Sequence, residues 1–181
     1  MLLKNILKIQ TGVYLKPDRF GNAVYIKVND FDENYQLSMN LQSNIMITQR
    51  MGHHLLQAGD VLFAAKGDYN FAAVYNNEYP SAIASSSFFV LKKSFEILSD
   101  YLAWFINHPD SQKKLKAEAK GSSIASISMK TLENLEIKIP DRETQESILV
   151  VDKLRKKEKR IQNELMMLKD QLIDTRILSR I

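Results

Sequence analysis

Two adjacent histidines, His53 and His54, are the side chains in this 181-residue sequence best suited to hold a metal or to act as a general base. Paired with a loop carboxylate, they would suit a small hydrolase. The third histidine, His108, is distant in the sequence, and the chain contains no cysteine, so a common zinc site cannot be assembled from neighbouring residues. We therefore interpret the pair as exposed loop residues and rank the hydrolase last among the candidate functions.

Carboxylates and serines form two further clusters. Asp30, Asp32 and Glu33 could bind a cation or transfer protons, but a solvated loop after a strand is the better interpretation, since nothing nearby suggests a partner. The serines at 85–87 fit a turn and a strand edge, because no histidine stands in a recognisable arrangement with them. The sequence also lacks a glycine-rich cofactor loop, an Asn-Pro-Pro-Tyr-like methyltransferase motif, a Walker lysine and a G-x-S-x-G elbow. We expect any catalysis to lie in another chain.

Composition favours one globular core in a reducing compartment. Hydrophobic residues make up 45% of the chain, enough for one core within residues 1–140. Without cysteine there are no disulfides, which suits the cytoplasm. The first seven residues are too polar for a signal peptide, and no apolar run reaches membrane length. The net charge of +4 permits nucleic-acid binding without demonstrating it.

The first 140 residues predict a β-rich domain followed by short helices. The predicted strands cover residues 23–28, 45–47, 61–65, 71–75, 87–91 and 135–139. Apolar residues at helical spacing predict a helix around 98–106, capped by Ser94 or Ser99 and stopped by Pro109. A second helix is expected from Asp110 to Lys120, ending at Gly121, and a helical turn at 129–134.

Residues 141–181 predict one long helix, with Asp141 after Pro140 as its N-cap. No glycine or proline interrupts it, and it would extend roughly 60 Å. Seven positions follow a heptad spacing typical of a coiled-coil partner: Val151, Leu154, Glu158, Ile161, Leu165, Leu168 and Leu172. Glu158 either faces solvent or fixes the pairing of the helices. The basic run from Lys153 to Arg160 fits a solvated face, with contact to a methyltransferase or DNA as the minor alternative.

The order of these pieces resembles the specificity subunit of Type I restriction-modification systems. Short segments carry the resemblance: Ile9 to Gly12 before 23–30, Gly59-Asp60-Val61-Leu62-Phe63-Ala64-Ala65-Lys66-Gly67, 101–107, 121–128, 132–140, and Gln145 on the first turn of the long helix. Each segment is short, whereas the ordered set followed by a heptad helix is specific. Members of that family have two recognition domains and two long helices, and this sequence has one of each.

The resemblance implies an α+β fold with two parts. Residues 1–140 would form a β-rich target-recognition domain with packed helices. Residues 141–181 would form the helix that pairs antiparallel with a second copy and docks methyltransferase subunits. The chain would itself be non-catalytic, directing an adenine methyltransferase and, in some complexes, a restriction subunit. S-adenosylmethionine, ATP and Mg²⁺ would belong to those partners, and a two-fold dimer would bind a bipartite inverted-repeat target in double-stranded DNA.

DNA contacts are then expected in the polar loops of residues 1–140. Basic side chains suited to phosphates are Lys16, Arg19, Lys66 and Lys120. Side chains suited to base edges are Gln49, Arg50, Asn70, Asn76 and Asn77. Tyr69 and Tyr75 are expected to stack on sugars or on a distorted base step. The alternative is a non-DNA adaptor whose helix recruits a partner while the globular part binds protein.

Overall fold

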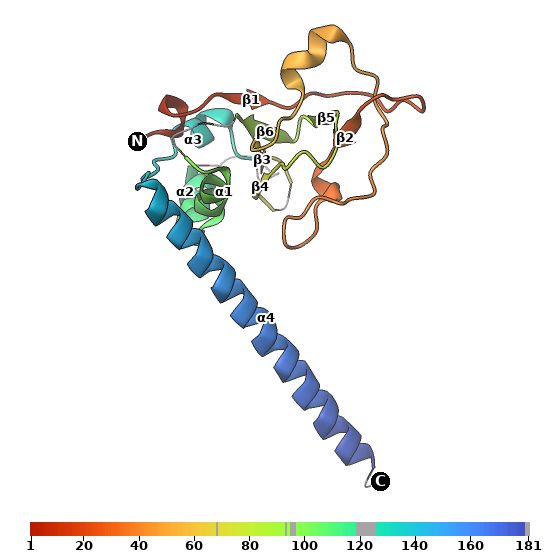
Figure 1. Cartoon of the computed structure of the whole chain (residues 1–181), viewed down its shortest axis with the longest axis vertical. Helices are drawn as coiled ribbons and strands as arrows, with labels where there is room; N and C mark the ends of the chain where they lie inside the picture. The colour runs from red at the N-terminus through yellow and green to blue at the C-terminus, as the bar shows by residue number, and fades with distance from the viewer. Residues whose placement is uncertain (68, 93, 95–96, 119–125, 180–181) are drawn as a thin grey trace. The chain divides into compact units, whose positions relative to one another are not determined.

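The chain folds into two compact units, Met1–Pro140 and Asp141–Ile181, which we call the head and the arm. The computed structural model describes residues 1–67, 69–92, 94, 97–118 and 126–179. The head contains β-sheet and short helices, and the arm is one long helix (Figure 1). This confirms the predicted α+β class. Antiparallel pairing of two arms remains a prediction.

The centre of the head is a four-stranded antiparallel sheet in the order β1-β6-β3-β4. Its strands are β1 (Ile9–Thr11), β3 (Val61–Ala64), β4 (Ala72–Val74) and β6 (Phe88–Leu91). Every residue of β3 and β6 is buried, so these two strands are covered on both faces and read as continuous apolar runs. The predicted strands 61–65, 71–75 and 87–91 are confirmed, with shorter bounds.

A second, two-stranded sheet joins β2 (Val24–Ile26) to β5 (Ala82–Ala84) in parallel. Strand β2 was predicted, but β5 was missed, because Ala-Ile-Ala lies in a polar linker and is too short to show a period. Both strands are fully buried. Their side chains divide between two apolar clusters, so this small sheet links the loops of residues 12–56 to the central sheet.

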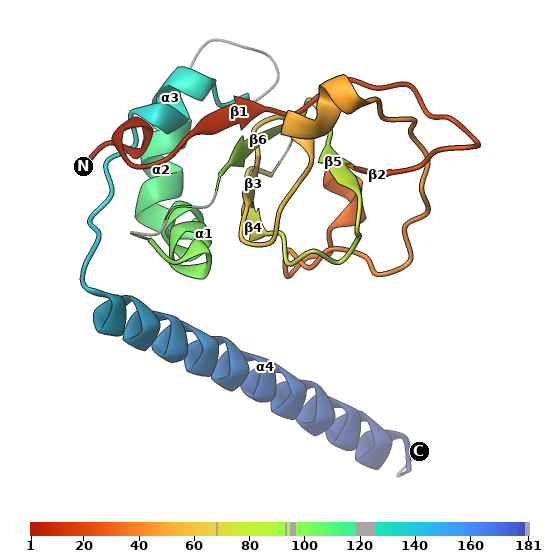
Figure 2. The same ribbon diagram turned by 45° about the horizontal axis from the view of Figure 1, so that its top comes forward.

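Short helices cover one end of the head, as Figures 1 and 2 both show. They are α1 (Ser99–Asn107), α2 (Pro109–Glu118) and α3 (Met129–Glu133), with the 3-10 turn η1 (Leu3–Asn5) beside α3. Two further 3-10 turns, η2 (Val28–Asp30) and η3 (Gln49–His54), lie at the other end, on the side of β2 and β5 (Figures 1 and 2). Helix α1 packs on β3 and β4, and the Asn107 amide accepts from Ala72 N at 2.8 Å and donates to Ala72 O at 2.7 Å.

Three local predictions were wrong. Residues 135–139 form no strand. Glu136 makes a single bridge, and the backbone of the segment bonds to Met1, Leu3 and the Tyr101 hydroxyl. Residues 45–47 make only a single bridge, between Ile45 and Ala23. Leu98, and neither Ser94 nor Ser99, occupies the N-cap of α1, and the Ser99 hydroxyl donates to Gly59 O at 2.6 Å. The expected helix end at Gly121 lies outside the described residues.

The arm is a single helix, α4 (Arg142–Leu178), of 37 residues. Asp141 is its N-cap, as predicted, and accepts hydrogen bonds from the Thr144 backbone at 2.8 Å and hydroxyl at 3.0 Å. These bonds favour the ionised carboxylate and lower the pKa of Asp141 below its usual value. At 1.5 Å per residue the helix is about 55 Å long.

Candidate nucleic-acid interface and the exposed face of the arm

The register of the central sheet shows that two loops with basic candidates leave the strands at the same end. Thr11 at the end of β1 and Phe63 near the end of β3 are both level with Phe89 of β6. The loop that follows β1 carries Lys16 and Arg19, and the β3–β4 hairpin carries Lys66 and Tyr69. All four side chains are exposed. Both loops therefore leave the strands at one end, and together they carry three cations and an aromatic ring.

Asn76 and Asn77 lie at the other end of β3 and β4. They follow Val74, which pairs with Val61 at the start of β3, so about 10 Å of strand separates them from the β3–β4 hairpin. Asn77 has a φ of 63°, a left-handed turn conformation that asparagine tolerates. These two residues belong to the turn after β4, at the opposite end of the strands from the loops that carry Lys16, Arg19 and Lys66.

Gln49 and Arg50 are exposed at the start of η3. The strand-like segment that leads into η3 is tied to the loop after β1, because the Asn22 side chain exchanges hydrogen bonds with the backbone of Ile47 at 2.9 and 3.4 Å. Gln10 of β1 also donates to His53 O at 3.2 Å. The structure thus connects the Gln49–Arg50 pair to the loop that carries Lys16 and Arg19.

Two predicted contact residues are buried, and a third cannot be placed. Tyr75 is 1% exposed, and its hydroxyl is hydrogen-bonded to the backbone of Tyr79, so its ring cannot stack on DNA. Asn70 is 7% exposed, and its amide donates to Ala64 O at 2.9 Å. Both positions are corrections to the predicted interface. Lys120 lies outside the described residues.

The histidine pair does not form a metal site with its neighbours. In the described parts of the chain, no group of three or more His, Asp or Glu side chains is placed to hold an ion. The rings of His53 and His54 are in contact at the end of η3, with centroids 4.0 Å apart and planes tilted by 43°. His53 is exposed, but His54 is half-buried, and this burial lowers its pKa below 6.5. The prediction of an exposed pair is therefore right for His53 only.

The Gly59-Asp60 motif has a structural role next to this pair. Asp60 is 1% exposed, and its carboxylate accepts from Lys92 Nζ at 2.7 Å and from Gln57 N at 2.9 Å. Gly59 has a φ of 91°, which only glycine adopts without strain. The motif closes the turn before β3 and connects it to the end of β6.

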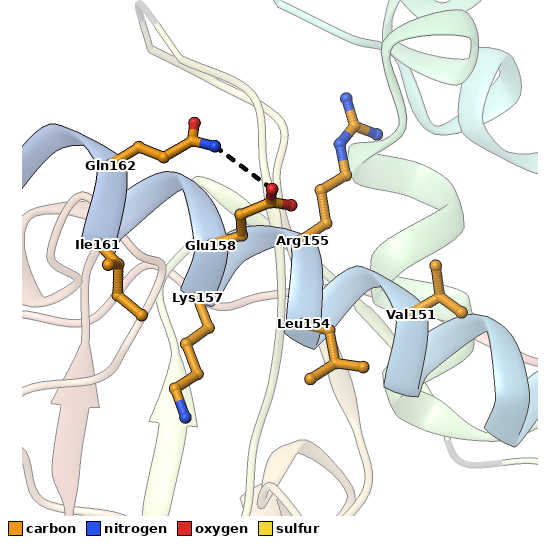
Figure 3. A pocket seen from close by; sticks show the side chains of 7 residues that line it. All are labelled: Val151, Leu154, Arg155, Lys157, Glu158, Ile161 and Gln162. Carbon is orange, nitrogen blue, oxygen red and sulfur yellow. Dashed lines mark hydrogen bonds between the residues drawn. The ribbon is translucent and has the colours of Figure 1, made fainter.

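The predicted heptad positions of the arm lie on one face of α4. Their apolar members, namely Val151, Leu154, Ile161, Leu165, Leu168 and Leu172, are between 50% and 64% exposed. We call these six residues, with Glu158, the apolar stripe. Figure 3 shows the shallow surface depression that Val151, Leu154, Glu158 and Ile161 line together with neighbouring polar side chains. A helix with an apolar stripe of this kind typically buries it against a partner.

Glu158 is the one acidic position in this stripe. Its carboxylate accepts a hydrogen bond from Gln162 Nε2 at 3.3 Å, one helical turn further on, as the dashed line in Figure 3 shows. The structure therefore gives Glu158 a local partner on the same helix. Neither of its two predicted roles, facing solvent or fixing the pairing, is tested by this contact.

The sequence-based prediction of the interface missed two exposed aromatic residues beside Lys16 and Arg19. Tyr14 and Phe20, in the loop after β1, are 74% and 86% exposed. The sequence carried a signal for them, because Tyr14 and Phe20 flank Lys16, Pro17, Asp18 and Arg19. Pro-Asp is a turn dipeptide, and a turn presents its neighbouring side chains to solvent.

Comparisons with known proteins match the head and most of the arm to one protein family. A family model described as the Type I restriction modification DNA specificity domain matches residues 2–166. The specificity subunit of the Type I restriction enzyme HindI from Haemophilus influenzae is 25% identical over 137 residues, which are 72% of this chain and 29% of that protein.

Two solved structures share the fold at low sequence identity. The HsdS subunit from Thermoanaerobacter tengcongensis matches with a TM-score of 0.62 and 18% identity, over 87% of this chain and 37% of that one. A chain from a study of assembly and conformational transition in the type I R-M system matches with a TM-score of 0.66 and 16% identity, over 89% and 39%. The chain belongs to the family of Type I restriction-modification DNA specificity domains. It spans less than two fifths of the length of these relatives.

No helix in the described residues is long and apolar enough to cross a membrane.

Proposed function

We propose that this chain is a DNA-specificity component of a Type I-like restriction-modification complex. The head recognises double-stranded DNA, and the arm pairs with a second arm and docks methyltransferase subunits. The chain performs no chemistry itself, and S-adenosylmethionine, ATP and Mg²⁺ act in the partner subunits. A restriction subunit joins the same complex where one is present. Such a complex works in the cytoplasm, where the DNA is.

One observation carries this proposal: a single family match runs through the whole head and across most of the arm. The exposed cations support it, since the loops that carry Lys16, Arg19 and Lys66 leave the strands at one end. Within the described residues these three side chains form no ion pair. Basic side chains of this kind neutralise phosphates and position a protein on the duplex. The exposed apolar stripe of the arm supports the second part, because it is suited to a helix partner.

Selection from a randomised 30-base-pair duplex library tests the DNA-binding function. We expect the full chain to enrich a defined sequence and to bind it more weakly as salt increases. Replacing Lys16 and Arg19 with alanine should lower the slope of log K against log salt by about 2 for each bound head, because each neutralised phosphate accounts for about 0.9 of that slope. Lys113 and Lys114, exposed on α2 at the helical end of the head, provide the matched double-alanine control. Absence of both enrichment and salt-dependent binding would refute the proposed function.

Pairing of two arms predicts the form of the target. A two-fold dimer presents two identical heads, and two identical heads require two half-sites in inverted orientation. The half-sites are then separated by bases that neither head contacts. Hydroxyl-radical footprinting of the enriched duplex should show two symmetric protected segments. A single contiguous and asymmetric footprint would contradict the dimer while leaving DNA binding intact.

A further inference from the structure

The loop between β1 and β2 carries two aromatic side chains and two cations, all exposed. Their order along the chain is Tyr14, Lys16, Arg19 and Phe20. Phe20 is 86% exposed and Tyr14 is 74% exposed, while Lys16 and Arg19 are exposed between them. In Figures 1 and 2 this red-orange loop projects from the end of the head that lies away from α1 and α2. Single apolar side chains on a surface are ordinary, so exposure alone assigns no role.

The first half of the loop is held by a buried tyrosine. The Tyr25 hydroxyl donates to Val13 O at 2.8 Å and accepts from Leu15 N at 3.2 Å. These bonds fix the backbone on both sides of Tyr14. Tyr25 itself belongs to β2 and is 6% exposed, so the anchor is part of the core.

The second half is a turn tied to the neighbouring segment. Asp18 accepts from the Phe20 amide at 2.9 Å through its side chain, and Asp18 N donates to Asn44 O at 2.8 Å. Two residues after Phe20, Asn22 N donates to Ile45 O at 2.9 Å. Phe20 therefore stands between two backbone anchors, and the Asp18 carboxylate is turned to the backbone of the loop.

This turn requires a glycine at position 21. A Cβ at this position would collide with the backbone of Asn44 and Ile45. The absence of a side chain therefore lets the turn press against residues 44–45, directly after the exposed phenylalanine. A turn that is already ordered loses little conformational entropy when a ligand binds to it.

An exposed apolar ring on an ordered turn, with cations beside it, fits nucleic acid better than it fits a protein partner. Apolar side chains inserted at a base step unstack the step and kink the duplex, and flanking cations contact the phosphates on either side. Base stacking on an aromatic ring also tolerates different sequences. An apolar protein surface would leave Lys16 and Arg19 unpaired.

We infer that Phe20 is a wedge that enters a base step of the bound duplex, with Lys16 and Arg19 on the adjacent phosphates and Tyr14 against the neighbouring sugar. This rests on the proposed DNA-specificity function and adds a residue that deforms DNA. Phe20 then contributes to specificity through the cost of unstacking, which is lowest at pyrimidine–purine steps. The wedge predicts such a step within or beside each half-site.

The test uses the full chain and a 30-base-pair duplex selected by the wild-type protein, with 2-aminopurine placed at one position after another. Its fluorescence rises when a base is unstacked. We expect wild type to raise it at one step in each half-site. Phe20→Ala should abolish this rise and weaken binding about 10- to 100-fold for each bound head, the range for losing one stacked base, without changing the salt slope. Phe20→Leu should keep part of the signal, since leucine is also found as a wedge.

Met39→Ala is the matched control, because Met39 is 70% exposed on another loop of the head. It should leave affinity and fluorescence unchanged, and thermal melts should show that all three variants remain folded. The wedge is refuted if Phe20→Ala binds with wild-type affinity, or if wild type unstacks no position of a duplex that it binds. If wild type selects no sequence and binds no duplex, the proposed function fails and the wedge fails with it.

Discussion

Replacing Ile161 with aspartate should abolish pairing of the arms while leaving the head folded. Ile161 lies midway along the apolar stripe, ten residues after Val151 and eleven before Leu172. In an antiparallel pair with full overlap, the two copies of Ile161 are therefore close to the two-fold axis. The substitution would place two carboxylates near each other in the most apolar part of the interface.

The size of the effect follows from the exposure of Ile161. Its side chain is 50% exposed in the isolated arm, so pairing can bury about half of the ~1.5–3 kcal/mol that full burial provides. Two copies then lose about 2 kcal/mol. Burying an unpaired carboxylate costs at least about 2 kcal/mol more. A total near 4 kcal/mol corresponds to roughly a thousandfold weaker dimer.

Light scattering and sedimentation over a range of concentrations measure this directly. Wild type should be a dimer at micromolar concentrations, and the Ile161→Asp protein should be a monomer with the same melting profile for the head. Met167→Asp is the matched control, because Met167 is 64% exposed on the same helix, about 120° around from Ile161. A dimer that survives Ile161→Asp but dissociates with Met167→Asp would show that another face of α4 forms the interface. A wild-type monomer at every concentration would refute self-pairing.

Three further predictions concern the head. Asp60→Ala leaves the Lys92 ammonium without its carboxylate at 2.7 Å, and we expect about 3 kcal/mol of lost stability in urea unfolding; a loss under about 1 kcal/mol would refute the structural role of the motif. Burial lowers the pKa of His54 in the folded chain, so the unfolded chain takes up its proton first, and stability should fall as pH drops through 6.5 towards the folded pKa. His54→Gln should flatten that part of the pH–stability curve, and an unchanged curve would contradict the assignment. Tyr75→Phe removes the hydroxyl bonded to the Tyr79 backbone and should cost about 1–2 kcal/mol of stability with no change in DNA affinity, whereas a loss of affinity would return Tyr75 to the interface.

The arm and the central strands could be predicted because their signals are local and long enough to count. Residues 142–178 contain no glycine or proline, and Asp141 supplies the cap, so the helix and its start follow from the sequence alone. Strand β3 follows from an apolar run after Gly59-Asp60. In both cases the signal lies within the element itself, so the prediction required no knowledge of distant residues.

Pairing and side-chain direction were harder to predict, because they depend on residues far apart in the sequence. Strand β5 exists through its parallel register with β2, 58 positions earlier, and three small residues carry no trace of that partner. The 135–139 segment alternates apolar and charged residues like a strand, yet its backbone is bound by the chain's first residues and the Tyr101 hydroxyl. The burial of Tyr75 was within reach, since Phe71, Ala73 and Tyr75 alternate and belong to the same core cluster.

The small net charge of the chain supports the same proposal as the arm does, namely that two heads act together on DNA. Lys16, Arg19 and Lys66 are the described exposed cations among the predicted phosphate contacts, and so few contacts give one head only weak, salt-sensitive binding. Joining two heads through paired arms makes the second binding event intramolecular, which raises the overall affinity without any new contact. If the arms pair, a helix of about 55 Å would do this better than a flexible linker, because it would set the distance between half-sites. A monomeric Ile161→Asp protein should therefore bind a single half-site as well as wild type does, and lose only the advantage of the second half-site. Equal affinity of both proteins for the complete duplex would show that the arms add nothing to recognition.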